Sequence, residues 1–139
     1  RMDSIQAAIL NIKIKYIDEW TELRIKKAEF YNKYLNNISQ IELPDISLHD
    51  KHVYHLYTIQ TEKRDELNKF LNSKNIQTKI NYPMIVPLLP AYKHLNYSFD
   101  DFPISFKSQS KILSLPLYPE ISSDKQLYVI ENIKNFFEI

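Results

Sequence analysis

The chain has 139 residues, enough for one domain with a substantial core but not comfortably for two. Apolar residues make up 44% and charged residues 25%, the usual mix of a globular protein, and the longest apolar run is too short and too rich in proline to cross a membrane. Eighteen basic residues oppose 17 acidic ones, so nothing indicates a nucleic-acid or membrane-surface binder. No apolar leader opens the sequence, and we expect a cytoplasmic protein.

Two residue types are missing. The absence of cysteine excludes disulfides and thiolate metal sites. The absence of glycine excludes the glycine-rich loops that cradle phosphate groups, at least within this chain.

The first predicted element is a long helix from Met2 to about Leu35. Its first half carries two apolar stripes at steps of three and four: Ile5, Ile9, Ile12, Tyr16, Trp20 and Leu23, then Leu10, Ile14 and Ile17. Some 34 helical residues would span roughly 50 Å, whereas a compact domain of this size has a radius of gyration of about 14 Å. We therefore expect the apolar first half to overhang the body and to need cover from a missing domain or a second chain. A break near Thr21, giving two shorter helices, is the alternative.

The remaining elements alternate between strands and helices. Strands are predicted at 41–43, 52–61, 76–82 and 112–117, with the strand at 52–61 showing the clearest alternation of side chains. Helices are predicted from Thr61 to Leu71, at 91–95, from Pro103 with Asp100 or Asp101 as its cap, and at the C-terminal end with a Ser123–Gln126 capping box.

This order predicts an α+β fold: a long N-terminal helix followed by a small β-α-β-α-β-α domain, with the helices on one face of the sheet. We divide the chain into a connecting helix at 1–35 and a small C-terminal domain at 36–139.

Most candidate chemical groups have simpler structural explanations. His49, His52 and His55 recur at threes, but His52 and His55 fall on opposite faces of the predicted strand and no carboxylate completes a metal site. Ser114 lacks the sharp strand-to-helix turn of a nucleophilic serine. We assign no catalytic residue and no metal ligand.

The stretch Asn81, Tyr82, Pro83 and Met84 has the strongest character of a binding site. It lies where a predicted strand ends and a proline-rich extended segment begins. Loops stiffened by proline at strand ends hold polar groups toward a ligand at low entropic cost. The alternative interpretation is a rigid connector.

Taken in order, several segments resemble the DegT/StrS-type sugar aminotransferases, which depend on pyridoxal 5'-phosphate (PLP). The start of the chain, RMDSIQAA, is similar to the family's R-M-D-x-I-Q-A-A signature. Further matching segments follow over essentially the whole chain: Arg24, Ala28 and Tyr31; His55-Leu56-Tyr57; Arg64-Asp65-Glu66-Leu67; Ile76-Gln77-Thr78 leading into Tyr82-Pro83; Pro90-Ala91-Tyr92; and Leu113 to Pro119.

The resemblance implies the C-terminal part of a fold-type-I enzyme that transfers an amino group from an amino acid to a keto sugar on a nucleotide carrier, for surface polysaccharide or glycan biosynthesis. It implies a homodimer with active sites at the subunit interface. The lysine that binds PLP would precede this chain, so the chain alone would be inactive. Arg1 would lie near the cofactor of the partner's site, and the Asn81–Met84 loop would face the sugar.

The chain departs from the family at this loop. The family usually has histidine where this chain has Asn81, and further family residues are replaced by Pro87 and Leu89. Asparagine can hydrogen-bond a sugar hydroxyl but cannot carry a proton near neutrality. These losses leave open a second hypothesis, a non-enzymatic binding or assembly module or a degenerate remnant of such an enzyme.

Overall fold

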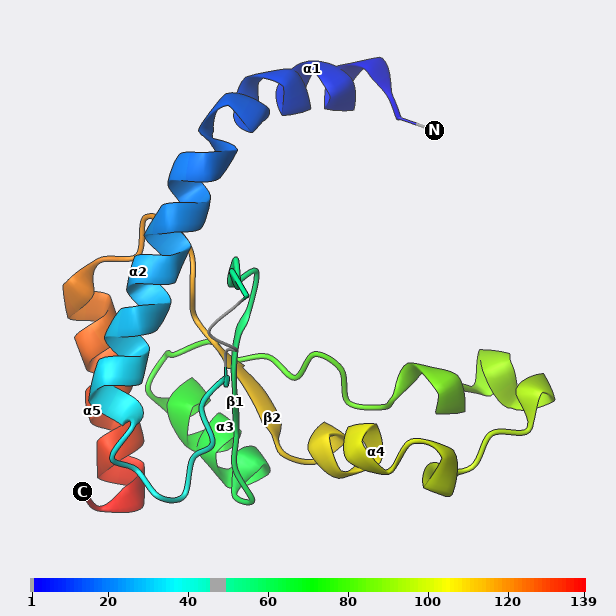
Figure 1. Ribbon diagram of the computed structural model, residues 1–139. Coiled ribbons are helices and arrows are strands. Elements are labelled where there is room, and N and C mark those ends of the chain that lie inside the picture. Colours follow the sequence, from blue (N-terminus) through cyan, green and yellow to red (C-terminus); the bar gives the residue numbers. More distant parts are fainter. Residues whose placement is uncertain (1, 46–49) are drawn as a thin grey trace.

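The computed structural model describes residues 2–45 and 50–139, which form several helices and one small sheet (Figure 1). In chain order the elements are α1 (Ser4–Lys13), η1 (Ile14–Tyr16), α2 (Ile17–Leu35), β1 (Tyr57–Gln60), α3 (Arg64–Ser73), η2 (Val86–Leu88), η3 (Pro90–Leu95), η4 (Phe99–Asp101), α4 (Pro103–Gln109), β2 (Ile112–Leu115) and α5 (Ser123–Phe137).

The sheet consists of β1 and β2, paired antiparallel with Thr58 opposite Ser114. Single bridges extend it on both sides, from Glu42 to Gln60 and from Lys79 to Ser114. The predicted strand at 76–82 is therefore wrong in extent, because only its Lys79 pairs. Pro83 closes this segment, and proline disfavours continued strand pairing since it has no N–H to donate.

The strand predicted at 52–61 also begins later, at Tyr57. Tyr54 has a positive φ of 48°, and its backbone N–H donates to Nδ1 of His52 over 3.0 Å. A residue in the left-handed region cannot continue an extended strand. This local turn explains why the apparent alternation from His52 onward does not become paired sheet.

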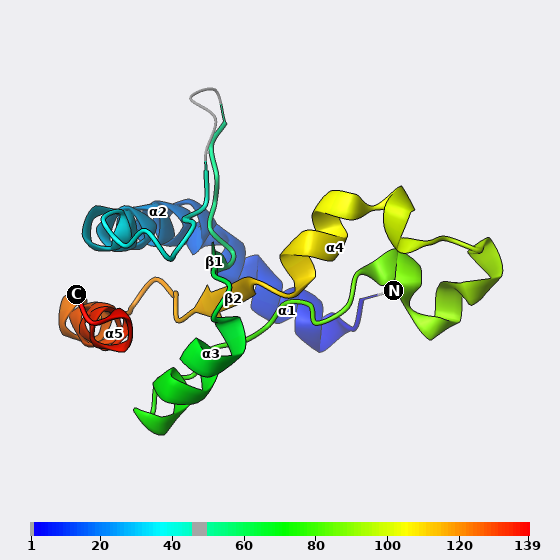
Figure 2. The same cartoon turned by 90° about the horizontal axis from the view of Figure 1, so that it is seen from below.

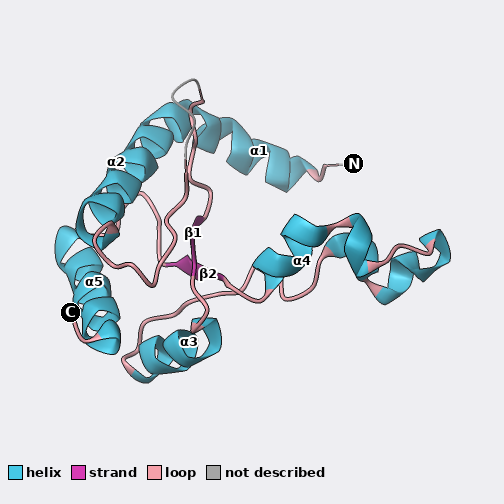
Figure 3. Ribbon diagram, turned by 60° about the horizontal axis from the view of Figure 1, so that its bottom comes forward, coloured by secondary structure: helices cyan, strands magenta, loops and turns pink. Residues whose placement is uncertain are grey.

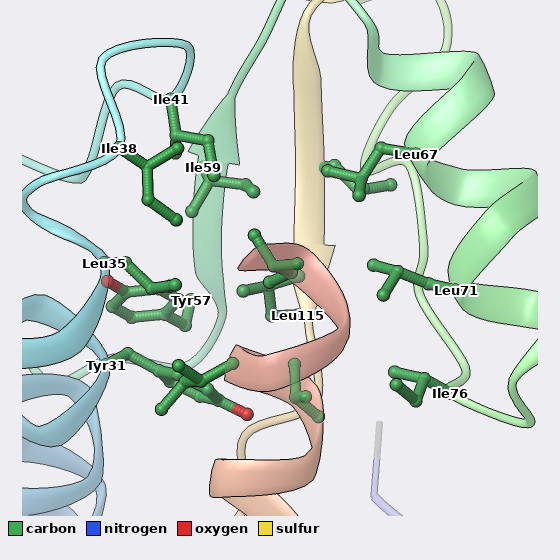
Figure 4. Close-up of a cluster of buried hydrophobic side chains, with 14 of the residues drawn as sticks. Tyr31, Leu35, Ile38, Ile41, Tyr57, Ile59, Leu67, Leu71, Ile76 and Leu115 are labelled. Atoms are coloured by element: carbon green, nitrogen blue, oxygen red, sulfur yellow. The ribbon is translucent and has the colours of Figure 1, made fainter. Parts of the chain in front are cut away.

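One face of the sheet carries the core, as Figure 4 shows. Tyr57 and Ile59 of β1 pair directly with Leu115 and Leu113 of β2, and all four side chains are buried. Helices α2, α3 and α5 cover this face with buried side chains that include Ala28, Tyr31 and Leu35, then Leu67 and Leu71, then Val129, Ile130 and Ile133. The prediction that the helices lie on one face of the sheet is confirmed.

The long N-terminal helix bends sharply between α1 and α2 (Figure 1). The turn η1 interrupts it, and Tyr16 at φ −111° and ψ 1° leaves helical geometry. The straight helix over 2–35 is therefore wrong, and the break lies before the alternative at Thr21. No residue of α1 is buried, and Ile5 is 72% exposed, so the expected exposure of this apolar segment is confirmed.

Two predicted helix caps are displaced. Ser122, not Ser123, caps α5 by accepting from the backbone N–H of Lys125, while the side chain of Gln126 turns inward and donates to the Lys27 carbonyl. Asp101 does not cap α4, because its carboxylate turns back to accept from the backbone of Ser98 and completes the capping box of η4, whose N-cap is Ser98.

Residues 83–110 form an arm that leaves the body between α3 and β2 and contains η2, η3, η4 and α4 (Figures 2 and 3). None of its side chains is buried. Gln109 ties its two ends together at the root: Oε1 accepts from the N–H of Ile85 at 3.0 Å, and its carbonyl accepts from Nη1 of Arg64 at 2.9 Å.

Candidate functional site

The polar side chains of the candidate site lie on the face of the sheet opposite the core, beside a groove that residues of α5 also line. Ser114 is at the centre of the site, because its backbone pairs with β1 on one side and exchanges two hydrogen bonds with Lys79 on the other, at 3.1 and 2.8 Å. Residues opposite one another on neighbouring strands point to the same face. Thr58, Ser114 and Lys79 therefore form a row, and Asn81, two residues after Lys79, lies on the same side.

Three of these side chains form a hydrogen-bonded chain. Nδ2 of Asn81 donates to Oγ of Ser114 at 3.2 Å, and this oxygen lies 3.0 Å from Oγ1 of Thr58. Ser114 is only 5% exposed. The neighbours thus satisfy the buried hydroxyl, and the Asn81 amide is held by one of its ends.

A groove of about 730 Å³ opens beside this chain of hydrogen bonds. Leu56, Leu115 and Leu117 contribute apolar lining, whereas Lys79, Asp124 and Lys125 bring charges of both signs to it. A groove that combines an apolar surface with a few oriented polar groups is typical of small-molecule sites. The polar chain and this groove together can hold a ligand that carries hydroxyl groups and negative charge.

The structure divides the stretch that the sequence singles out. Asn81 lines the groove, but Tyr82 and Met84 line a separate pocket of about 370 Å³ together with Gln109 of the arm. Tyr82 is 70% exposed, and Pro83 is exposed as well. Arg1, the predicted cofactor contact, lies outside the described residues. The assignment of these residues to a substrate stays a prediction, and only Asn81 shares the groove.

Sequence reasoning missed Ser114 and Thr58 as site residues. It weighed Ser114 only as a nucleophile, although both residues point outward from strands whose alternate positions are apolar. That alternation was the available signal. Their contact depends on the register of β1 against β2, which the sequence does not display.

The histidines form no metal cluster in the part of the chain that the structure describes. His49 is outside that part. His52 and His55 both line a small pocket with Pro44 and Thr58, and the Nδ1 of His52 is occupied by the Tyr54 N–H. Because the paired strand begins only at Tyr57, the argument that opposite strand faces separate them does not apply.

Two buried tyrosines support the site from the core side. The Tyr31 hydroxyl donates to the Pro116 carbonyl at 2.9 Å, and the Tyr57 hydroxyl donates to Oδ1 of Asn32 at 2.6 Å. Burial raises the pKa of Tyr31 and of Tyr57 above the ordinary tyrosine value. Both phenols are therefore neutral near pH 7, and the Tyr31 bond fixes the segment after β2 that forms one rim of the groove.

The surroundings of the lysines bear on whether this chain could bind PLP through an imine. An imine-forming lysine needs a desolvated environment that lowers its pKa. All the lysines lie in the described ranges, and none of them is buried. The side chain of Lys111, among the more protected ones, is paired with Glu62.

Comparison with known proteins gives the family. The model of the DegT/DnrJ/EryC1/StrS aminotransferase family matches residues 1–134, and the chain belongs to this family. It is 37% identical to a pleiotropic regulatory protein of Geobacillus stearothermophilus over 99% of this chain and 37% of that protein. It is 34% identical to dTDP-3-amino-3,6-dideoxy-alpha-D-galactopyranose transaminase of Aneurinibacillus thermoaerophilus, over 98% of this chain and 37% of that enzyme.

Solved structures agree with the family. The chain superposes on S. venezuelae DesV, solved in complex with a ketimine intermediate, with a TM-score of 0.92 and 34% identity, covering 100% of this chain and 38% of that one. NtdA of Bacillus subtilis, 28% identical with a TM-score of 0.83 over 100% of this chain and 33% of that one, was solved with the cofactor PMP bound. The chain spans about 37% of the length of the curated relatives it matches. In residues 2–45 and 50–139, no helix is long and apolar enough to cross a membrane.

Proposed function

We propose that this chain forms the C-terminal part of a PLP-dependent aminotransferase that transfers an amino group from an amino acid to a keto sugar carried on a nucleotide. The observation that carries the proposal is the match along the whole chain to a nucleotide-sugar transaminase, and the superposition on DesV with its ketimine intermediate agrees with it. The groove beside Asn81 supports it, since a polar chain next to an apolar surface suits a sugar nucleotide.

In this proposal the chain supplies one wall of the substrate site, and α1 with α2 connects it to the part that binds the cofactor. PLP, when bound there, supplies the electron sink for amino transfer. Asn81 binds a sugar hydroxyl, and Lys79 and Lys125 favour the negative charge of a nucleotide diphosphate. The functional unit is a homodimer in the cytoplasm that serves polysaccharide or glycan synthesis, and the 139 residues alone do not catalyse.

The first experiment uses the protein as its source cells make it, isolated with an antibody raised against this chain. We expect a species well above the mass of 139 residues that aminates a dTDP- or UDP-linked ketohexose with glutamate as donor. A species of 139 residues without transaminase activity would overturn the proposal. A parallel experiment incubates the 139-residue chain with PLP and borohydride, and a stoichiometric adduct at one lysine would contradict its proposed inactivity.

A second function, a non-enzymatic assembly module, is favoured by the exposed apolar surface of α1. Met2, Leu10, Ile14 and Ile17 line a concave surface at its bend toward α2, with Trp20. Sedimentation over a range of concentrations tests this function. A defined dimer of the 139-residue form, isolated from its cells without activity, would support the module, whereas a well-folded monomer would contradict it.

A further inference from the structure

Asn81 has an unequal environment on its two sides. Its Nδ2 is committed to Ser114, whereas its Oδ1 makes no hydrogen bond to any group in the described ranges. The side chain lines the groove and is only partly buried. One end of the amide is thus fixed to the sheet, and the acceptor end remains for a ligand.

The hydroxyls of Ser114 and Thr58 form the polar support behind the Asn81 amide. Ser114 has one proton to donate, and its oxygen already accepts from Asn81. Oγ1 of Thr58 lies 3.0 Å from the same oxygen, and either hydroxyl can donate in this contact. When Ser114 donates to Thr58, it has no proton left for the Asn81 oxygen, so an inverted amide would require both hydroxyls to reverse.

The Ser114 hydroxyl cannot easily move away. Its backbone is paired on both sides, to Thr58 across β1 and to Lys79, and the residue is 5% exposed. Flexible polar side chains lose affinity by ordering on binding, whereas an amide held in advance does not. The rigid centre of the sheet therefore preorganises a side chain that sits at its edge.

We propose that Ser114 and Thr58 are positioning residues, which hold Asn81 with its Oδ1 facing the groove so that the site accepts a hydroxyl or amino donor of the ligand. The inference rests on the proposed function only for the identity of the ligand, a sugar that carries such a donor. It also assigns a role to a buried serine that is unsuited to be a nucleophile.

The test first measures the orientation of Asn81 without any ligand. The side-chain amide protons of Asn81 are assigned in the ¹⁵N spectrum of the 139-residue chain by their loss in Asn81→Asp. We expect Ser114→Ala to raise their exchange rate with water about tenfold, the effect of one lost neutral hydrogen bond. Ser114→Thr, which keeps a hydroxyl, should stay close to wild type. The same contrast is expected between Thr58→Val and Thr58→Ser, with a smaller change.

The second measurement is binding of dTDP-glucose and UDP-glucose to the protein at the length found in its cells. Ser114→Ala and Asn81→Ala should each weaken binding about three- to tenfold, and the double variant should be no weaker than Asn81→Ala alone, because Ser114 acts through Asn81. Ser114→Thr should restore binding. If Ser114 had only a structural role, the losses of binding affinity in Ser114→Ala and Asn81→Ala would add up in the double variant.

The outcomes separate this inference from the proposed function. Unchanged Asn81 amide exchange in Ser114→Ala would overturn the positioning role. Faster exchange together with unchanged sugar-nucleotide binding would overturn the assignment of Asn81 to the ligand. Faster exchange, with no transaminase activity or sugar-nucleotide binding in the wild-type protein, would support the positioning role and overturn the proposed substrate.

Discussion

The body of the molecule and its arm use similar side chains in different surroundings. In the body, Tyr31 and Tyr57 lie with ring centroids 5.0 Å apart, and both are fully buried. In the arm, Phe99 and Phe106 lie 4.4 Å apart, yet they are 56% and 40% exposed. Aromatic contact alone therefore does not make a core. What distinguishes the body is that three helices close over one face of a sheet, whereas nothing in the described ranges closes over the arm.

The largest expected effect comes from the same substitution made in both regions. Leu113→Ala, at a side chain with no exposure, should lower the free energy of unfolding by about 2–5 kcal/mol because it leaves a cavity in the core. Leu95→Ala in the arm, where the leucine is 47% exposed, should change it by less than about 0.5 kcal/mol. Urea unfolding measures both. A loss above 2 kcal/mol for Leu95→Ala would show that the arm belongs to the cooperative core.

The second effect is a pH dependence of stability that comes from the two buried tyrosines of the body. Because burial raises the pKa of Tyr31 and Tyr57 in the folded state, folding favours their protonated forms. Their contribution to stability is complete below the ordinary tyrosine pKa near 10 and is lost as pH rises above it, at about 1.4 kcal/mol per phenol and pH unit. Denaturant titrations between pH 8 and 11.5 should show this decline. The variant carrying Tyr31→Phe and Tyr57→Phe should be less stable at pH 8 but lose less above pH 10, and an equal slope would contradict the assignment.

The third effect tests the start of α5. Ser122→Ala should lower the free energy of unfolding by about 1 kcal/mol. The Ser122 hydroxyl accepts from the Lys125 N–H in the first turn of α5, the helix that packs on the core. Ser123→Ala, one residue later, is the matched control and should stay within about 0.5 kcal/mol of wild type. Thermal unfolding compares the two. If Ser123→Ala were the costlier change, the cap predicted from the sequence would be the correct one.

The cap illustrates how far the sequence leads. The helical pattern of α5 and its core face were predictable from spacing alone, and residues such as Ile130 and Ile133 are buried as expected. The cap was displaced by one residue because Gln126, which suits a capping box, instead donates to the Lys27 carbonyl across the core. A tertiary contact separated by 99 residues overrides a local motif, and local reasoning has no access to it.

The candidate site shows the same limit. Asn81 could be singled out because it stands at a strand end before prolines, a purely local feature. Its partner Ser114 follows only from the pairing of three segments far apart in the chain. Tyr82 and Met84, although close to Asn81 in sequence, line another pocket, because the chain bends at residues 81, 83 and 84.

The fourth effect concerns the root of the arm. Gln109→Ala removes the acceptor for the Ile85 N–H and should free the two ends of the arm from each other. Cleavage by chymotrypsin at the aromatic residues of the arm should then be about two- to tenfold faster, the effect of one hydrogen bond on local opening. Gln109→Glu keeps an acceptor oxygen and is the control. The free energy of global unfolding should hardly change, because no arm side chain is buried. A large fall in it would instead show that the arm and the body unfold as one cooperative unit.

The smallest effect lies within the arm. Asp101 accepts from the backbone N–H of Ser98 at 2.7 Å and from its hydroxyl at 3.0 Å, and these bonds hold the pKa of the Asp101 carboxyl below its usual range. Bonds to the charged form stabilise the local turn above pH 4, and the contribution is lost as pH falls through the lowered pKa. Ser98→Ala removes the hydroxyl and keeps the backbone donor, so the pKa should rise only part of the way toward about 3.9 in a carboxyl NMR titration. Because the carboxyl is fully exposed, the unfolding midpoint of the body should not follow this titration. A midpoint that did follow it would mean that the two regions fold as one unit, even though only the body has a core.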